Sequence, residues 1–252
     1  MKQKIKNQFK EFTLLLKSVP SVFLSLFVLS VVAMNLLANK SINIPVEWLA
    51  LDCGIIVSWV AFLTMDVLTK HFGPKASTQI SVFALIINLI TCLLLFIVSV
   101  IPGVWGESFV EGSENIINSA LDNTFGGTWY VVLGSSVAFI ASALINNFLN
   151  FAIGKAFKTK PDGFGAYVCR SYVSTAVAQF ADNLIFALLV SHFFFGWTVT
   201  QCLTCAATGM IAELLCELLF ASLGFKICKK WKSEQIGKSY FDFKNELMEA
   251  RQ

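Results

Sequence analysis

Residues 80–101 read ISVFALIINLITCLLLFIVSVI, an apolar run without a single charged side chain. A helix rises about 1.5 Å per residue, so a run of this length crosses the roughly 30 Å of hydrocarbon in a lipid bilayer. A bilayer also accepts apolar side chains around the whole circumference of a helix. The stretch therefore predicts a transmembrane helix.

The composition of the whole chain also indicates a membrane protein. Of its 252 residues, 56% are hydrophobic and only 14% are charged, and they include 24 Phe and 6 Trp. One water-soluble core could not hide so many large apolar side chains, which argues against a soluble enzyme. The formal net charge of +3 is too small for a basic surface that binds nucleic acid. We therefore expect a lipid bilayer as the environment and no nucleic acid as a partner.

Apolar runs of about 20 residues recur along the chain. They lie approximately at Ser18–Ala38, Trp48–Asp66, Ile80–Ile101, Thr128–Ile153, Tyr172–Phe193 and Thr198–Phe225. The first run follows a basic segment, but it is too long for the apolar core of a signal peptide and has no clear cleavage site. We predict an all-α polytopic membrane protein with six transmembrane helices.

The basic residues indicate the orientation of these helices. All of the 19 Lys and Arg residues except Lys40 fall on one side of the six-span topology. Because cytoplasmic segments are enriched in Lys and Arg, both termini are expected in the cytoplasm. The predicted division is a cytoplasmic basic N-terminus at 1–17, a transmembrane domain at 18–225 and a cytoplasmic basic tail at 226–252.

The connection at 102–127 is predicted to be the one long extracytoplasmic loop. It carries four acidic residues and no basic one: Glu107, Glu111, Glu114 and Asp122. Within it, Ser113 could cap a short amphipathic helix with Ile116, Ile117, Ala120 and Leu121 on one side. An interfacial helix or lid and a plain solvated loop both fit this pattern.

Sequence motifs for catalysis are weak. There is no Walker loop, no G-x-S-x-G and no H-E-x-x-H. Cys202 and Cys205 form a C-x-x-C near the outer end of the sixth span, with Cys53 at a similar depth on the second, which is compatible with a membrane thiol oxidoreductase. Small cysteines that pack between helices explain them as well. His71 and His192 fall on opposite sides of the membrane, so we expect no metal site. Because the catalytic motifs are missing, we also expect no cofactor and no enzymatic activity.

Polar side chains inside the spans are the candidates for function, because a carboxylate at the centre of a membrane helix costs about 2.5–3.5 kcal/mol on insertion scales. On the fifth span, Gln179 and Asp182 share one helical face near the midplane, and Asn183 adds an amide. On the sixth, Glu213 and Glu217 share a face one turn apart. Like charges and burial both disfavour ionisation, so at least one of these two glutamates is expected to be protonated and the pair could carry a proton.

Other polar residues admit a structural role as readily as a functional one. The fourth span brings three amides into the inner half of the membrane: Asn146, Asn147 and Asn150. Such amides often only bridge helices, with hydrogen bonds of about 0.6 kcal/mol. Near the inner boundary, Asp66 and Lys70 could form an interfacial ion pair or, with Arg170, act in gating. Asp52, one turn inside the outer boundary, could simply reach water, or it could form an outer mouth with Asn35.

Three stretches resemble one known family. They are TMDVLTKHFGPKA at residues 64–76, RSYVSTAVAQFAD at 170–182 and, more weakly, NLLANK at 35–40. The first resembles the signature of the queuosine precursor transporters, also called the vitamin uptake transporter family, and the second resembles the Ser/Thr-rich fifth helix of that family. The resemblance implies a multi-pass carrier of deazaguanine bases in the bacterial cytoplasmic (inner) membrane.

The chain departs from the family pattern at two places. An Asn cluster stands late in the fourth span where the family tends to have a Gln and an Asp, and Glu213 stands where family members often have a Lys one turn before a Glu. Replacing an intramembrane cation by a carboxylate should change which ligand group or ion is favoured.

A deazaguanine presents a ring N–H beside an exocyclic amine, and a carboxylate can accept both hydrogen bonds. Asp182 or Glu213 could accept them. Gln179, Asn183 or Asn147 could meet the carbonyl of the base, and Phe186 or Trp59 could stack on its ring. Another flat polar vitamin would suit the same groups.

Three hypotheses therefore stand. The first is a carrier for a nucleobase-like or vitamin-like solute, with proton coupling through Glu213 and Glu217. The second is a substrate-binding subunit of a multicomponent vitamin importer, and the third is the thiol oxidoreductase. The expected partners are a planar polar small molecule and the bilayer, and protons and a second copy of the chain are candidates.

Overall fold

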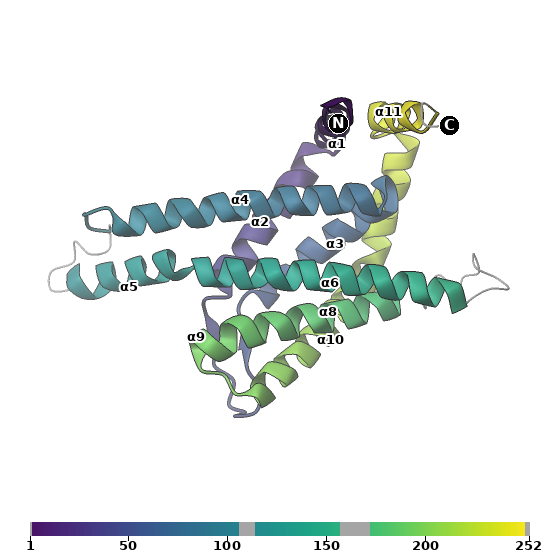
Figure 1. The fold of residues 1–252 in the computed structure, drawn as a ribbon. Coiled ribbons are helices and arrows are strands. Elements are labelled where there is room, and N and C mark those ends of the chain that lie inside the picture. The colour runs from purple at the N-terminus through teal and green to yellow at the C-terminus, as the bar shows by residue number, and fades with distance from the viewer. Residues whose placement is uncertain (1, 106–113, 157–171, 250–252) are drawn as a thin grey trace. The chain divides into compact units, whose positions relative to one another are not determined.

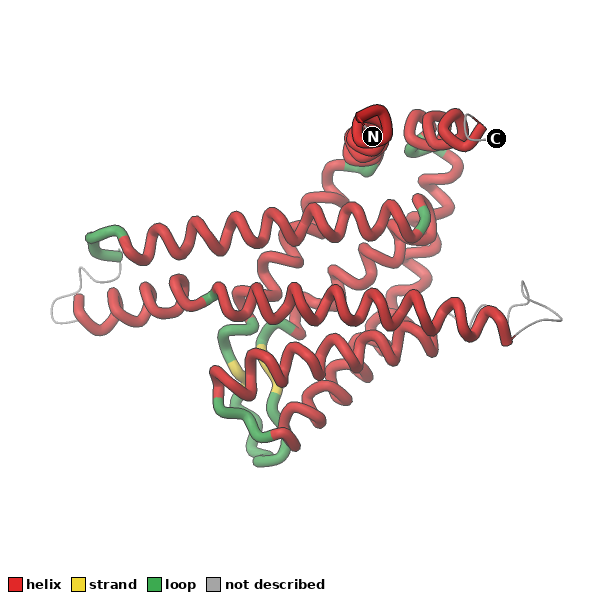
Figure 2. The backbone as a smooth tube through the Cα atoms, in the orientation of Figure 1, coloured by secondary structure: helices red, strands yellow, loops and turns green. Residues whose placement is uncertain are grey.

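The computed structural model describes residues 2–105, 114–156 and 172–249, and these residues are helical almost throughout (Figures 1 and 2). Two short strands are the exception. In chain order the elements are α1 Lys2–Ser18, α2 Ser21–Leu37, β1 Ser41–Ile42, β2 Leu51–Asp52, α3 Ile55–Phe72, α4 Pro74–Val100, α5 Glu114–Gly127, α6 Trp129–Ala156, α8 Ser174–Phe186, the π-helix η3 Ala187–His192, α9 Phe193–Phe195, α10 Val199–Ser233 and α11 Lys238–Glu249.

The apolar helices confirm the predicted all-α membrane fold. Among the described residues, five helices are long and apolar enough to cross a bilayer, and the number is up to six if α1 and α2, which meet at 102°, count as one span. Helix α2 has 17 residues, which is about 26 Å of helix and close to the shortest membrane span. Pro20 has no N–H to donate and separates α1 from α2.

The predicted start of the second span is wrong. The second span was expected to begin at Trp48, but α3 begins only at Ile55, because residues 41–52 form an antiparallel hairpin in which Ser41 pairs with Asp52. On the sixth span, α10 continues as a helix past the predicted span end at Phe225 and ends at Ser233. Its extra two turns are basic, and apolar patterning alone does not detect a helix that continues beyond the hydrocarbon.

The connection at 102–127 is helical in its second part, so a plain solvated loop is the wrong interpretation for α5. The Trp105 backbone N–H donates to Asn118 Oδ1 at 2.9 Å, and its indole Nε1 donates to Asp122 Oδ1 at 2.8 Å. These bonds hold the end of the preceding segment against α5. The predicted cap, Ser113, lies outside the described residues.

The chain divides into two compact units, and four of the long helices contribute to both. Unit 1 comprises Met1–Val32, Val57–Asn88 and Cys216–Gln252, and unit 2 comprises Ala33–Ile56 and Leu89–Leu215. Each unit has its own core.

Unit 1 is built around aromatic side chains from α3, α10 and α11. Phe72 stacks on Phe241 at 5.7 Å and meets Tyr240 edge-on at 5.9 Å, and Trp231 packs beside them. His71 Nε2 lies 2.9 Å from the carbonyl oxygen of Ile236. The end of α3 is thereby attached to the segment between α10 and α11, and α11 in turn lies beside α1 (Figure 1).

Unit 2 is built on α6 and α8, which pack side by side (Figure 1). Gly134 of α6 allows this approach, because a Cβ at that position would overlap the Val190 side chain of η3. Val131, Val190 and Ala38 form the buried centre of one cluster. Gly196, with φ of 71°, reverses the chain after α9 and leads it into α10.

Candidate functional site

The carboxylate of Asp182 lies between two helices of unit 2. Asp182 is on α8, and its Oδ1 accepts a hydrogen bond of 2.8 Å from Ser142 Oγ on α6. The Ser142 hydroxyl also lies 3.0 Å from the Phe139 carbonyl of its own helix. One turn earlier on α8, Gln179 is only 3% exposed. A half-buried carboxylate with a hydroxyl partner is thus present between two apolar helices.

The next residue, Asn183, connects α8 to α10. Its amide Nδ2 donates to Glu213 Oε2 at 3.3 Å, and Glu213 is 4% exposed. Gly209 stands one turn before Glu213 on the same face of α10. A Cβ at Gly209 would lie 2.8 Å from Asn183 Nδ2, so the glycine leaves the space that the amide occupies.

Two hydrogen bonds therefore join three membrane helices through one pair of adjacent residues. Neighbouring side chains on a helix point about 100° apart, so Asp182 can face α6 while Asn183 faces α10. The polar row is Ser142, Asp182, Asn183 and Glu213. Three of its members were candidates from the sequence, and Ser142 was not, because a serine in a membrane helix usually bonds its own backbone.

Asp52 lies outside the helices, which corrects the prediction that it sits inside the second span. It is the last residue of β2, and its Oδ1 accepts a 2.7 Å bond from the Gly54 backbone N–H. Burial raises the pKa of Asp52 from 3.8 to about 6, against the opposing effect of the Gly54 bond. Both Asp52 and Glu213 lie within electrostatic range of the Cys205 thiol.

The remaining candidates in unit 2 lie around this row. Asn35 is buried near the end of α2, and Phe186, the last residue of α8, packs against the cluster of Ala38, Val131 and Val190. Asn39 donates from Nδ2 to Thr128 Oγ1 at 3.3 Å, which links the end of α2 to the start of α6.

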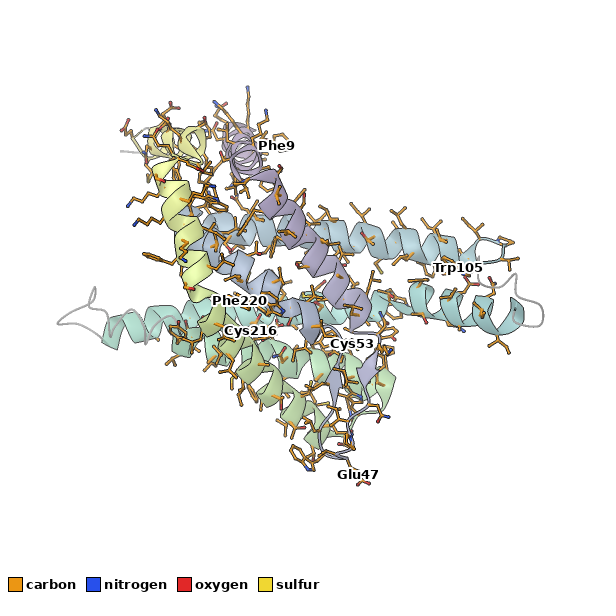
Figure 3. All side chains as sticks on the ribbon, turned by 180° about the vertical axis from the view of Figure 1, so that it is seen from behind. Phe9, Glu47, Cys53, Trp105, Cys216 and Phe220 are labelled. Atoms are coloured by element: carbon orange, nitrogen blue, oxygen red, sulfur yellow. The ribbon has the colours of Figure 1, made fainter. Side chains whose placement is uncertain are left out.

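Several candidate residues lie in unit 1, and the structure does not describe the side chains of several others. Trp59 and Phe220 both belong to unit 1, where their rings stack with centroids 4.5 Å apart and planes inclined by 14° (Phe220 is labelled in Figure 3). Lys70 is exposed on α3. The structure does not describe the side chains of Asp66, Asn146, Asn147, Asn150 and Glu217, and Arg170 lies outside the described residues. The roles predicted for these residues stay predictions.

Cys202 and Cys205 lie in a cluster of apolar side chains. Cys202 is fully buried, and its thiol donates to the Ala187 carbonyl at 3.4 Å. All cysteines in the described parts of the chain are free thiols. Within those same parts, no group of three His, Cys, Asp or Glu side chains is placed to hold a metal ion.

The row offers both kinds of hydrogen-bonding group that a flat polar solute needs. Its carboxylates accept N–H donors, and its amides can both donate and accept. Apolar helix surfaces surround it, which strengthens each of these bonds relative to water.

A comparison with protein families places this arrangement among known sequences. The model of a family described as "Putative vitamin uptake transporter" matches residues 52–225, a range that contains Asp52 and the whole polar row. The match confirms the family resemblance seen in the sequence motifs. No curated protein and no solved structure matches the chain.

Proposed function

The chain belongs to the vitamin uptake transporter family, and from this premise we propose that it imports a flat polar solute across the membrane, either a deazaguanine base that serves as a queuosine precursor or a related nucleobase-like or vitamin-like compound. The membrane is the bacterial cytoplasmic membrane. Uptake is driven by protons that the glutamates of α10 carry.

The observation that carries this proposal is the polar row of unit 2. Asp182, Asn183 and Glu213 are held by hydrogen bonds between α6, α8 and α10 inside apolar spans. Ionisable residues at such depth are expensive to insert and are therefore functional candidates. A purely structural bridge would need amides and hydroxyls but no carboxylates, which cost more to bury.

Asp182 accepts the donor edge of the solute in this proposal. A carboxylate offers about four acceptor positions, so the bond from Ser142 leaves capacity for two parallel bonds from a ring N–H and an exocyclic amine. Gln179 stands one turn away to meet a carbonyl, and Phe186 supplies an aromatic face.

Glu213 and Glu217 supply the titratable proton. Glu213 is buried and bonded to the amide of Asn183, one residue from Asp182. A change in its protonation alters the hydrogen bonding of Asn183 and so reaches the solute site through adjacent residues. Uptake should therefore respond to a pH gradient.

A ligand screen on the purified chain tests the proposal. Nucleobases, deazaguanines and vitamins are added in turn, and binding is measured by thermal shift and calorimetry. A deazaguanine or related base should bind, and Asp182→Asn should weaken that binding. Failure of every flat polar solute to bind contradicts the proposal.

Uptake into proteoliposomes containing only this chain distinguishes a carrier from a substrate-binding subunit. A carrier accumulates labelled solute unaided, whereas a subunit of a multicomponent importer binds solute without moving it. Replacement of Cys202 and Cys205 by Ser should leave uptake intact, and loss of uptake in that variant would favour the thiol oxidoreductase.

A further inference from the structure

The first helix of the chain has an apolar stripe that unit 1 covers only in part. Along α1, Ile5, Phe9, Phe12 and Leu16 recur at the spacing of one helical face. Phe12 meets Phe83 edge-on at 6.0 Å and Leu16 is half-buried, but Ile5 is 58% exposed and Phe9 is 71% exposed (Phe9 is labelled in Figure 3). The stripe is packed at its C-terminal end and open at its N-terminal end.

The exposed charge of α1 is entirely basic. Lys6, Lys10 and Lys17 are exposed and lie on one side of the apolar stripe, at helical positions about 90° to 130° from its centre. The one acidic residue of the helix, Glu11, is buried and bound by Lys75 Nζ of α4 at 2.7 Å. Glu11 therefore does not offset the lysines at the surface.

The axis of α1 runs across the direction of the membrane span that follows it. Helices α1 and α2 meet at 102°. Membrane helices tilt on average about 20° from the bilayer normal. With α2 crossing the bilayer, α1 therefore lies nearly parallel to the membrane surface at which the chain begins.

We propose that α1 is an interfacial helix that binds the anionic phospholipids of that membrane surface. Ile5 and Phe9 insert among the upper acyl chains, and Lys6, Lys10 and Lys17 contact the phosphate groups. An apolar stripe flanked by lysines, on a helix parallel to the surface, is the arrangement that anionic interfaces bind. A soluble acidic partner would complement the lysines but would leave Ile5 and Phe9 without an apolar environment.

The lipid contact is connected to the rest of unit 1. Lys75, which binds Glu11, is in the first turn of α4, and Lys10 Nζ lies 4.3 Å from the Phe243 ring centre on α11. Anionic lipid bound at α1 therefore stabilises the packing of α1 on α4 and α11. The thermal stability of the protein should rise with the anionic lipid content of its membrane.

The orientation of α1 is tested with a fluorescent coumarin amino acid in the full chain, in nanodiscs whose acyl chains carry a quencher near the headgroup. The probe replaces Phe9 in one protein and Gln3, which is exposed on another face of α1, in the control. The probe at position 9 should be quenched several-fold more strongly than the probe at position 3. Equal quenching at the two positions overturns the proposal.

The charge requirement is tested with the triple variant Lys6→Gln, Lys10→Gln and Lys17→Gln. The matched control, Lys229→Gln, Lys232→Gln and Lys238→Gln, removes the same charge from exposed positions of α10 and of the start of α11. Phosphatidylglycerol is titrated against phosphatidylcholine in mixed micelles, and the rise in melting temperature reports binding.

Each lysine near an anionic surface contributes roughly a fivefold factor in affinity. The α1 variant should therefore need at least tenfold more phosphatidylglycerol than the wild type for the same stabilisation. The control variant should stay within about threefold of the wild type. An α1 variant that responds like the wild type, or a control variant that loses as much, overturns the proposal.

Discussion

Asp182 and Ser142 form the contact on which the proposed site depends most. Replacing Ser142 by Ala removes the 2.8 Å donor to the carboxylate but retains the carboxylate itself. We expect solute binding to weaken by about 0.5–1.5 kcal/mol, because Asp182 loses a hydrogen bond that orients it. Calorimetry with the best ligand from the screen measures the change.

The matched control for Ser142 is Ser136 on the same helix. Its hydroxyl donates to the Val132 carbonyl at 2.6 Å, so Ser136→Ala removes a hydroxyl from α6 without touching Asp182. Binding should be unchanged in this variant. Equal effects of the two alanine variants would contradict a role for Ser142 in positioning Asp182.

Asp52 gives the protein a predictable dependence on pH. Its pKa is raised by burial from 3.8 to about 6, so the folded state favours the protonated carboxyl. Its contribution to stability is fully present below about pH 4 and is lost as the pH rises towards 6. Asp52→Asn should therefore be more stable than the wild type at pH 7.5 and equally stable at pH 4. The expected difference in the free energy of unfolding at pH 7.5 is about 1–2 kcal/mol, which is less than the full pKa shift implies because the side chain is partly exposed.

Melting temperatures in detergent between pH 4 and pH 8 measure this difference. Asp242→Asn on the exposed side of α11 serves as the control and should follow the wild-type profile. Parallel profiles for Asp52→Asn and the wild type would contradict a buried, protonatable Asp52.

At the scale of elements, α10 contains a glycine whose role is defined by its neighbour on α8. A Cβ at Gly209 would stand 2.8 Å from the amide of Asn183, so Gly209→Ala should displace Asn183 from Glu213. Alanine normally stabilises a helix over glycine by about 0.5–1 kcal/mol. We nevertheless expect Gly209→Ala to bind solute at least fivefold more weakly.

Gly224 on the same helix is the control for Gly209. A Cβ there would meet Val67 Cγ2 at 3.3 Å and Leu63 Cδ1 at 3.4 Å, which are ends of side chains that can shift. Gly224→Ala should leave binding unchanged and should not lower the melting temperature by more than a few degrees. Unimpaired binding in Gly209→Ala would contradict the proposed contact between α8 and α10.

At the scale of the whole molecule, the sequence predicts a topology that labelling can test. All basic residues except Lys40 are predicted on the cytoplasmic side. A membrane-impermeant label should therefore reach a tag at position 40 from outside the cell, and a tag at position 238 only after the membrane is opened. Labelling of both positions from the same side would contradict six spans with cytoplasmic termini.

The length and apolarity of the runs were enough to predict the membrane fold, because crossing hydrocarbon constrains about 20 consecutive residues. The start of α3 was not predictable in this way. Leu49, Ala50 and Leu51 are as apolar as the helix that follows, but Leu51 pairs with Ile42 in the hairpin, and Leu49 and Ala50 lie in the loop between its strands.

The residues of the candidate site could also be predicted from the sequence only in part. Asp182, Asn183 and Glu213 could be selected from the sequence because buried carboxylates and amides are rare in membrane helices. Ser142 could not be selected, since it meets Asp182 across 40 residues of chain and only through the packing of α6 on α8. Gly209 likewise gave no signal without Asn183 beside it.

The measurement that tests the central claim most directly is uptake of a labelled deazaguanine base by proteoliposomes containing the wild type or Asp182→Asn. The variant keeps the volume of the side chain and removes the charge that accepts the donor edge of the base. The proposal predicts saturable uptake by the wild type and at least a tenfold loss in the variant, which corresponds to about 1.5–3 kcal/mol of lost binding. Uptake by Asp182→Asn at the wild-type rate would contradict the assignment of the polar row as the transport site.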